Sequence, residues 1–210
     1  MPSQKSITQP AAALAPKRER GRQRVAAILD AGAAVFAEKG FDAATMTEIA
    51  ARADTAIGSL YRFFPTKEVL ADALLTRHWE RLRAALDDIE ARAAQLSPDQ
   101  IADALIEMMQ GRLPERDAVL AFVESRSDRA NLRSKLRGDM RRRIAAILTA
   151  ASQRLPQANA ETKAIVLLHM LKLVSQIPQE KASVRTALLQ ETREAIRRQV
   201  ASSLLGVRSA

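Results

Sequence analysis

The sequence predicts an all-α protein, with a small three-helix domain near the N-terminus and a larger helical domain behind it, about nine helices altogether. Aromatic residues make up only 3% of the 210 residues, and there are seven glycines. Sandwiches and barrels need many aromatic or β-branched residues and many turns. Apolar side chains instead recur at three- and four-residue spacing, as they do on the buried face of a helix.

The composition excludes several classes of protein. The chain has no cysteine, which excludes disulfides, thiolate catalysis and cysteine-ligated metal sites. His78 and His169 are far apart, and no glycine-rich phosphate loop or nucleophile motif is present, so we expect no metal, no cofactor and no enzyme activity. The longest apolar stretch, residues 165–174, is too short for a membrane span, and residues 1–20 lack the apolar core of a signal peptide. A cytoplasmic protein without a membrane segment is predicted.

Positive charge is concentrated in two segments. The formal net charge is +9; residues 1–24 hold six Lys or Arg and one Glu, and residues 126–143 hold eight Lys or Arg and two Asp. The first segment has the character of a basic arm that binds a polyanion, or of a solubilising tail. The second has apolar residues at helical spacing, so its arginines are expected to coat the exposed face of an amphipathic helix.

The N-terminal elements are predicted from their start and stop signals. Residues 1–16 are expected to form a flexible leader, and a first helix runs from about Arg20 to Gly40, a natural C-cap. Thr45 and Glu48 have the spacing of a capping box, in which each residue satisfies a backbone N–H of the other. They start a short second helix that should end near Asp54.

A third short helix follows after a tight turn, which makes a helix-turn-helix, the unit that places its second helix in the major groove of DNA. This third helix runs over about residues 56–63, and Pro65 prevents its continuation. Leu60 and Phe64 are its expected core anchors. Its other side combines a low surface with hydrogen-bond donors, through Ala56, Gly58, Ser59, Tyr61 and Arg62.

Six further helices are expected in the second domain. The fourth begins at Thr66, and the fifth begins at Ser97, with Pro98 at the first helical position and Gly111 beyond its end. The remaining four are marked by apolar residues: a sixth with Val119, Leu120 and Phe122, a seventh with Leu132 to Leu148, and two last helices over about residues 160–176 and 180–205.

An ordered series of short motifs runs through residues 20–70: Phe36–Phe41 (FAEKGF), Ala44-Thr45, Glu48–Ala50, Gly58–Tyr61 (GSLY), Phe64–Glu68 (FPTKE) and Leu70. In order and spacing they resemble the tetracycline-repressor-like (TetR) family of bacterial transcriptional regulators. The resemblance implies a helix-turn-helix DNA-binding domain over residues 17–65. It also implies a ligand-sensing and dimerisation domain over residues 66–210.

The resemblance implies DNA contacts for individual residues. Phosphates would be held by Thr45, Ser59, Tyr61 and Lys67, and base edges would be met by Ile57, Arg62 and Phe63. Arg22 or Arg24 would reach a phosphate or the minor groove, while Ala56 and Gly58 let the helix approach closely. Helix capping is the alternative role for Thr45 and Ser59, core packing is the alternative for Tyr61, and an ordinary charged first turn is the alternative for Lys67.

The turn departs from the family pattern. It reads Asp54-Thr55-Ala56 where the family usually has Gly-Val-Ser. Aspartate tolerates a left-handed backbone conformation, so the turn is expected to survive. Thr55 replaces the usual buried aliphatic residue and should loosen the packing between the two short helices. Ile57, where the family commonly has a polar residue, indicates either contact with a thymine methyl group or a simple van der Waals fit.

The function implied by the resemblance is sequence-specific repression, relieved by a small apolar or amphipathic effector ligand. A pocket for that ligand would be lined by Trp79, Met108, Met109, Phe122, Met140 and Met170, although the same residues can serve as ordinary core. The alternative function is that of a helical adaptor or architectural protein, which binds DNA non-specifically through the basic N-terminal arm.

A homodimer is expected because residues 165–174 are apolar almost all around their helix, and one side must find a second surface or stay exposed. The alternative is a monomer in which the fifth to seventh helices cover the entire apolar face. The last two helices would pair with those of a second copy through Ile165, Leu168, Leu171, Leu188, Ile196 and Val200. Two recognition helices about 34–36 Å apart would then read a palindromic operator in double-stranded DNA.

Overall fold

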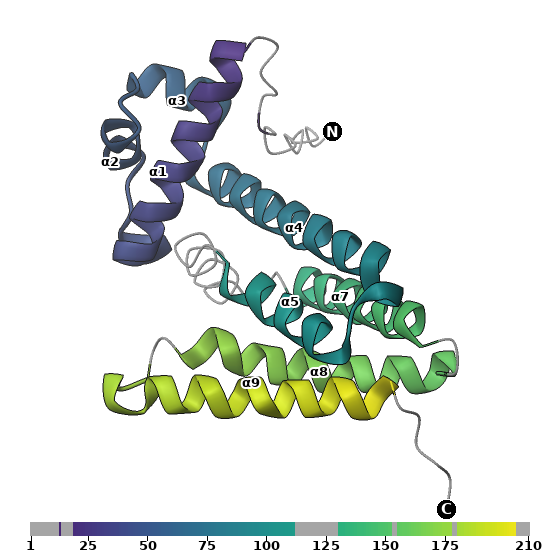
Figure 1. Cartoon of the computed structure of the whole chain (residues 1–210). Helices are drawn as coiled ribbons and strands as arrows, with labels where there is room; N and C mark the ends of the chain where they lie inside the picture. Colours follow the sequence, from purple (N-terminus) through teal and green to yellow (C-terminus); the bar gives the residue numbers. More distant parts are fainter. Residues whose placement is uncertain (1–12, 14–18, 112–129, 153–154, 178–179, 205–210) are drawn as a thin grey trace, which may run out of the picture. The chain divides into compact units, whose positions relative to one another are not determined.

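The computed structural model describes residue 13 and residues 19–111, 130–152, 155–177 and 180–204 (Figure 1). Every regular element within these ranges is a helix. The described residues form two compact units, the first ending at Trp79 and the second beginning at Glu80. The all-helical prediction is confirmed for this part of the chain, while the predicted sixth helix lies outside the described residues.

The first unit contains α1 (Glu19–Ala43), α2 (Met46–Arg52), α3 (Ile57–Phe63) and the first half of α4 (Lys67–Arg92). Large side chains from all four helices are fully buried in its core: Ile28, Phe36, Ile49, Leu60, Leu70 and Leu74. α1 and α4 approach closely at Gly32, where an added Cβ would lie 3.1 Å from Leu70 Cδ2. An alanine there would therefore force the Leu70 side chain to shift by a few tenths of an ångström.

α1 breaks at Gly40, where a helix end was predicted. Gly40 has φ 77° and ψ 166°, a conformation that glycine adopts without steric cost. One more turn follows, so that the helix as a whole runs to Ala43. The Phe36 and Phe41 rings pack across the break, with their centroids 5.5 Å apart.

The second short helix has both of its predicted ends. The Thr45 side chain accepts a hydrogen bond from the Glu48 N–H (3.2 Å), and Glu48 accepts one from the Thr45 N–H (3.1 Å), so the capping box is confirmed. Asp54 has φ 46°, as predicted for the turn. The Thr55 N–H donates to Ala50 O (3.0 Å) and the Asp54 N–H to Ala51 O (3.2 Å), which is the Schellman pattern at a helix C-terminus.

The second unit contains the rest of α4, the 3₁₀ helix η1 (Ala93–Gln95), α5 (Pro98–Gln110), α7 (Ala130–Ala151), α8 (Gln157–Gln176) and α9 (Ala182–Leu204). Ser97 caps α5 and forms a capping box with Gln100, with Pro98 at the first position as predicted. α8 packs against α5, α7 and α9, and α5 also packs against α9. α8 and α9 lie side by side (Figure 1).

Ion pairs join helices within the second unit. Arg197 of α9 donates to both oxygens of Asp103 of α5, at 3.2 and 2.6 Å. Arg143 of α7 pairs with Asp87 of α4 and with Asp139 of its own helix. The described part of the basic segment therefore has two roles: Arg142 stands 71% exposed, as expected of a solvated helix face, while Arg143 is 18% exposed and joins two helices.

Candidate nucleic-acid interface

One side of α3 faces solvent. Leu60 and Phe63 point inward, with exposed fractions of 0% and 4%. Because α3 has only seven residues, these two buried side chains determine which side of the helix faces solvent. Ile57 and Tyr61, one helical turn apart, are 41% and 47% exposed. Ala56, Gly58 and Arg62 are also exposed, and Ser59 is half-buried. Tyr61 is therefore not a core aromatic residue.

Gly58 leaves open space on this side of the helix. A Cβ added at Gly58 would have no heavy atom within 4 Å. The fold thus has no steric need for glycine at this position, in contrast to Gly32 in α1. The missing side chain lowers the helix surface beside Ile57 and Tyr61, so a ligand as large as a duplex can approach the helix backbone closely there.

Phe63 corrects one prediction. Its side chain is 4% exposed and belongs to the hydrophobic core, next to the equally buried Phe64. The expectation that Phe63 meets a base edge is therefore wrong for its side chain. The Arg62 guanidinium lies 4.9 Å from the centre of the Phe63 ring, so Phe63 supports an exposed cation instead.

One arginine of α1 lies near this exposed side. Arg24 Nη1 lies 3.5 Å from Ser59 Oγ and donates a hydrogen bond to it across the two helices. Arg22 pairs with Glu19 on its own helix. Of the two arginines predicted to reach DNA, the structure therefore brings Arg24 to α3.

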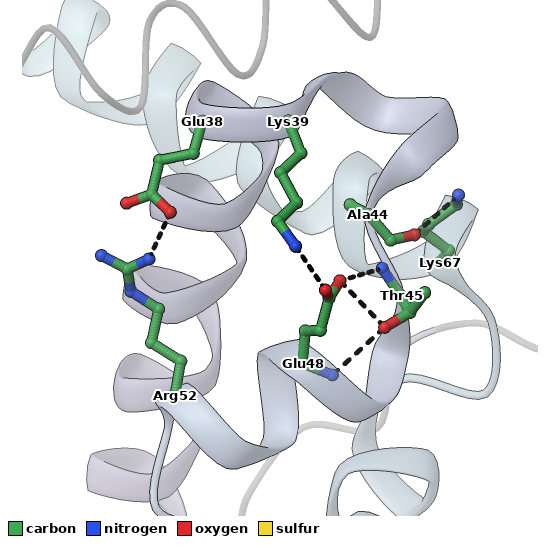
Figure 2. Close-up of polar contacts among 7 residues, drawn as sticks. All are labelled: Glu38, Lys39, Ala44, Thr45, Glu48, Arg52 and Lys67. Atoms are coloured by element: carbon green, nitrogen blue, oxygen red, sulfur yellow. Dashed lines mark hydrogen bonds and ion pairs between the residues drawn. The ribbon is translucent and has the colours of Figure 1, made fainter.

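Thr45 is exposed at the start of α2, in a network drawn in Figure 2. Glu48, which accepts from Thr45, also accepts from Lys39 of α1 at 2.5 Å. The hydrogen bond from Lys39 and those from Thr45 hold the pKa of Glu48 below its usual value. A second pair, Arg52 with Glu38 at 2.7 Å, lowers the pKa of Glu38 by hydrogen bonding and raises that of Arg52. Neither ion pair was predicted from the sequence. A usable signal was present, because Glu38 and Lys39 are adjacent on the first helix, and two residues of opposite charge, Glu48 and Arg52, stand four residues apart on the second.

Lys67 has partners within the protein. Its Nζ donates to the carbonyl oxygens of Asp42 (2.9 Å) and Ala44 (3.0 Å) and lies 4.7 Å from the centre of the Phe41 ring. The side chain is half-buried. The ammonium is thus directed at the end of α1. The residues next to Lys67 in the sequence do not predict these contacts.

The residues predicted to line a ligand pocket are not brought together by any described pocket. Trp79 is half-buried in the first unit; in the second, Met108, Met109 and Met170 are half-buried and Met140 is buried. Phe122 lies outside the described residues. A shallow hollow of about 250 Å³ lies elsewhere, on α9, lined by Thr186, Leu189, Gln190, Arg193, Glu194 and Arg197. The effector pocket stays a prediction.

The predicted dimer surface needs a correction. Leu168, Leu171, Ile196 and Val200 are at most 3% exposed and form the core of their own unit. They cannot contact a second copy while the unit stays folded. Ile165 and Leu188 are exposed, and so are three other large apolar residues of the same two helices: Val166, Leu173 and Val184.

The described residues contain no cluster of three or more His, Asp or Glu residues suited to a metal ion. No helix among them combines the length and the apolar character that crossing a bilayer requires.

Comparisons with known proteins agree with this geometry. Residues 28–74 match the family model for bacterial regulatory proteins of the tetR family. Over 69 residues the chain is 44% identical to the HTH-type transcriptional repressor KstR of Mycolicibacterium smegmatis, an alignment that covers 33% of this chain and 34% of that protein. The chain therefore matches about a third of the length of this relative.

Solved structures extend the similarity of fold to most of the chain. A transcriptional regulator of the TerR/AcrR family from Aquifex aeolicus superposes with a TM-score of 0.66 at 20% identity, covering 83% of this chain and 98% of the other. A gamma-butyrolactone receptor described as ArpA-like superposes with a TM-score of 0.58 at 20% identity, over 86% and 99% of the two chains. At this level of identity the similarity is one of fold.

Proposed function

Since residues 28–74 match the family model for bacterial regulatory proteins of the tetR family, we propose that the chain is a sequence-specific, DNA-binding regulator of transcription. The observation that carries this proposal is the solvent-facing side of α3, where Ile57 and Tyr61 stand 41% and 47% exposed and Gly58 leaves open space beside them. A short helix with this profile fits the major groove, where the helix backbone must come close to the base edges.

The contacts divide into two kinds. The Tyr61 hydroxyl, the Thr45 hydroxyl and the Arg24 guanidinium are suited to phosphates, which fix the register of the protein on the duplex. Ile57 and Arg62 project from the exposed side of α3 and are suited to base edges, which carry the sequence information. Arg24 also donates to Ser59, so one cation is held against the recognition helix before DNA binds.

A homodimer is part of the proposal. The exposed apolar residues of α8 and α9 would meet those of a second copy, and burying them removes apolar surface from water: Ile165, Val166, Leu173, Val184 and Leu188. Two-fold symmetry then predicts a palindromic operator with half-sites about one helical turn apart.

Regulation by a small ligand is proposed as well. The similarity of fold to a gamma-butyrolactone receptor supports a ligand-binding second unit, with an effector that is small and apolar or amphipathic. Such an effector would release the repressor from DNA only if it bound the DNA-free conformation more tightly. A regulator of bacterial transcription acts in the cytoplasm, where the chromosome lies.

The test is a selection of duplexes from a random 30-base-pair pool by the purified full-length protein. We expect an enriched palindrome that unrelated duplex displaces only at large excess. Equal competition by unrelated duplex would instead identify an architectural protein that binds DNA without sequence preference. Small molecules that then lower the affinity for the selected duplex would identify the class of effector.

A further inference from the structure

Lys67 occupies an unfavourable position for its own helix. It is the first residue of α4, where the helix dipole places partial positive charge, so a lysine ammonium is disfavoured there. The side chain leaves that helix end and reaches the C-terminal turn of α1 instead. There the last carbonyl groups lack helical partners and the dipole favours a cation.

The ammonium binds the connection between α1 and α2 on several sides. It donates to Asp42 O at 2.9 Å and to Ala44 O at 3.0 Å, and the ring of Phe41 lies 4.7 Å away. Phe41 is 7% exposed, so this ring is itself fixed by the core. Two of the three N–H groups of Lys67 are therefore used within the protein.

The segment that Lys67 holds leads directly to a proposed DNA contact. It begins after the backbone break at Gly40 and ends at Ala44, and the next residue is Thr45, the N-cap of α2 (Figure 2). Within the segment Ala43 and Asp42 are exposed, and only Phe41 and Ala44 are buried. The hydrogen bonds of Lys67 therefore contribute directly to the place where α2 begins.

We propose that Lys67 is a positioning residue for DNA binding: it fixes the connection between α1 and α2, and thereby the place of Thr45, without itself contacting a phosphate. The DNA part of this inference rests on the proposed function, and the structural part does not. It differs from the role that the family resemblance implies for Lys67, in which the ammonium binds the DNA backbone.

The two roles differ in salt dependence. The plot of log affinity against log salt has a negative slope, and removing a cation that neutralises one phosphate makes this slope less steep by about 0.9. Lys67→Met keeps most of the length of the side chain but removes the charge and both hydrogen bonds. We expect it to weaken binding to the duplex selected from the random pool about tenfold, the factor for one charge-assisted hydrogen bond, with an unchanged slope. Arg24→Met is the calibrating variant: it removes one cation from each subunit of the proposed dimer, so its slope should become less steep by about 1.8 per duplex, or about 0.9 per subunit. Lys135→Met, which changes an exposed residue of α7, is the control for charge alone.

Hydrogen exchange of the protein without DNA tests the structural part. In Lys67→Met the amides of Thr45 and Glu48 should exchange about tenfold faster, because the start of α2 is held less firmly, while amides of α5 in the other unit keep their rates. A double variant with Thr45→Ala should lose less DNA affinity than the two single variants combined, since both act through the same helix start.

Several results would overturn the proposal. A salt slope that becomes less steep by about 0.9 per subunit of the dimer, with unchanged exchange at Thr45, would assign Lys67 to a phosphate. Unchanged affinity would deny it any role in binding. If Lys67→Met does not fold, Phe41→Leu removes the ring beneath the ammonium and keeps the charge. We expect faster exchange at Thr45 by about threefold in this variant, and no change would refute the positioning role. If the wild-type protein selects no duplex, the proposed function fails, while the exchange experiment still decides whether Lys67 holds the connection.

Discussion

Lys39 of α1 donates to Glu48 of α2 at 2.5 Å, using the same carboxylate that caps α2 through Thr45 (Figure 2). One side chain thus closes the start of a helix and fastens that helix to its neighbour. The start of α2 also carries a proposed DNA contact. Protonation of Glu48 should therefore weaken both the cap of α2 and the attachment of α2 to α1.

The first prediction concerns acid pH. The pKa of Glu48 is lowered by its hydrogen bonds from Lys39 and Thr45, so the carboxylate stabilises the folded state above its unfolded pKa, about 4.3, and this contribution is lost as the pH falls through the lower folded value. Glu48→Gln should be less stable than wild type at pH 6, and the difference should shrink toward pH 3. Urea unfolding at several pH values measures it. A difference that stays constant over this range would contradict the assignment.

The second prediction concerns the open position on α3. Gly58→Ala should leave the fold intact and raise its stability by up to about 1 kcal/mol, because an added Cβ meets no atom within 4 Å and alanine is the better helix former. Affinity for the selected duplex should nevertheless fall at least about tenfold, since the methyl group stands between the helix and the base edges. Thermal unfolding and a binding titration measure the two effects. If Gly58→Ala binds the duplex with wild-type affinity, this side of α3 does not contact DNA.

Gly32→Ala is the matched control for that experiment. Its added Cβ would lie 3.1 Å from Leu70 Cδ2 in a packed core. We expect the opposite pattern, a decrease of about 1 kcal/mol or more in stability from overpacking. The pair of variants therefore separates glycine needed for packing from glycine needed for a partner.

The third prediction separates positioning from sequence readout. Tyr61→Phe removes only an exposed hydroxyl, so the stability should be unchanged and the affinity should fall by a similar factor for every operator variant. Ile57→Ala should instead change the preferred base at one position of the half-site. Titrations against a panel of duplexes with single base-pair changes measure both. A uniform decrease in affinity for Ile57→Ala would assign this side chain to general contact alone.

The fourth prediction concerns the dimer surface. Leu173→Glu and Val166→Glu change residues that are 52% and 42% exposed, so each should leave the helices folded and produce monomers in sedimentation. Leu168→Glu, at 3% exposed, should unfold the second unit, because it buries an unpaired charge. Circular dichroism distinguishes the two kinds of variant. A wild-type protein that sediments as a monomer at micromolar concentration would refute the dimer and the palindromic operator together.

Features set by a few neighbouring residues could be predicted from the sequence. The caps at Thr45 and Ser97, the helix break at Gly40 and the left-handed turn at Asp54 follow from local backbone chemistry, and the structure confirms each of them. Their physical causes act only between residues that are close along the chain. For this reason a single sequence is sufficient to place them.

Features that depend on distant partners could not be predicted. α3 has only seven residues, too few for periodicity to show that Phe63 points inward and Tyr61 outward. Residues 165–174 of α8 are apolar on nearly all sides, so their sequence does not distinguish the side buried by its own unit, with Leu168, from the exposed side, with Leu173. Lys67 finds its acceptors 23 and 25 residues away.

Gly40 has a consequence that concerns chirality. An L-type Cβ at this position would have no heavy atom within 4 Å, so what disfavours alanine is the handedness of the backbone at φ 77° and not a lack of room. A positive φ of this size is natural for a residue of the opposite configuration. D-Alanine, introduced by chemical ligation, would suit the native backbone and would restrict the unfolded chain more than glycine does. At this position a mirror-image residue would therefore be the conservative replacement, and its natural L-counterpart the disruptive one.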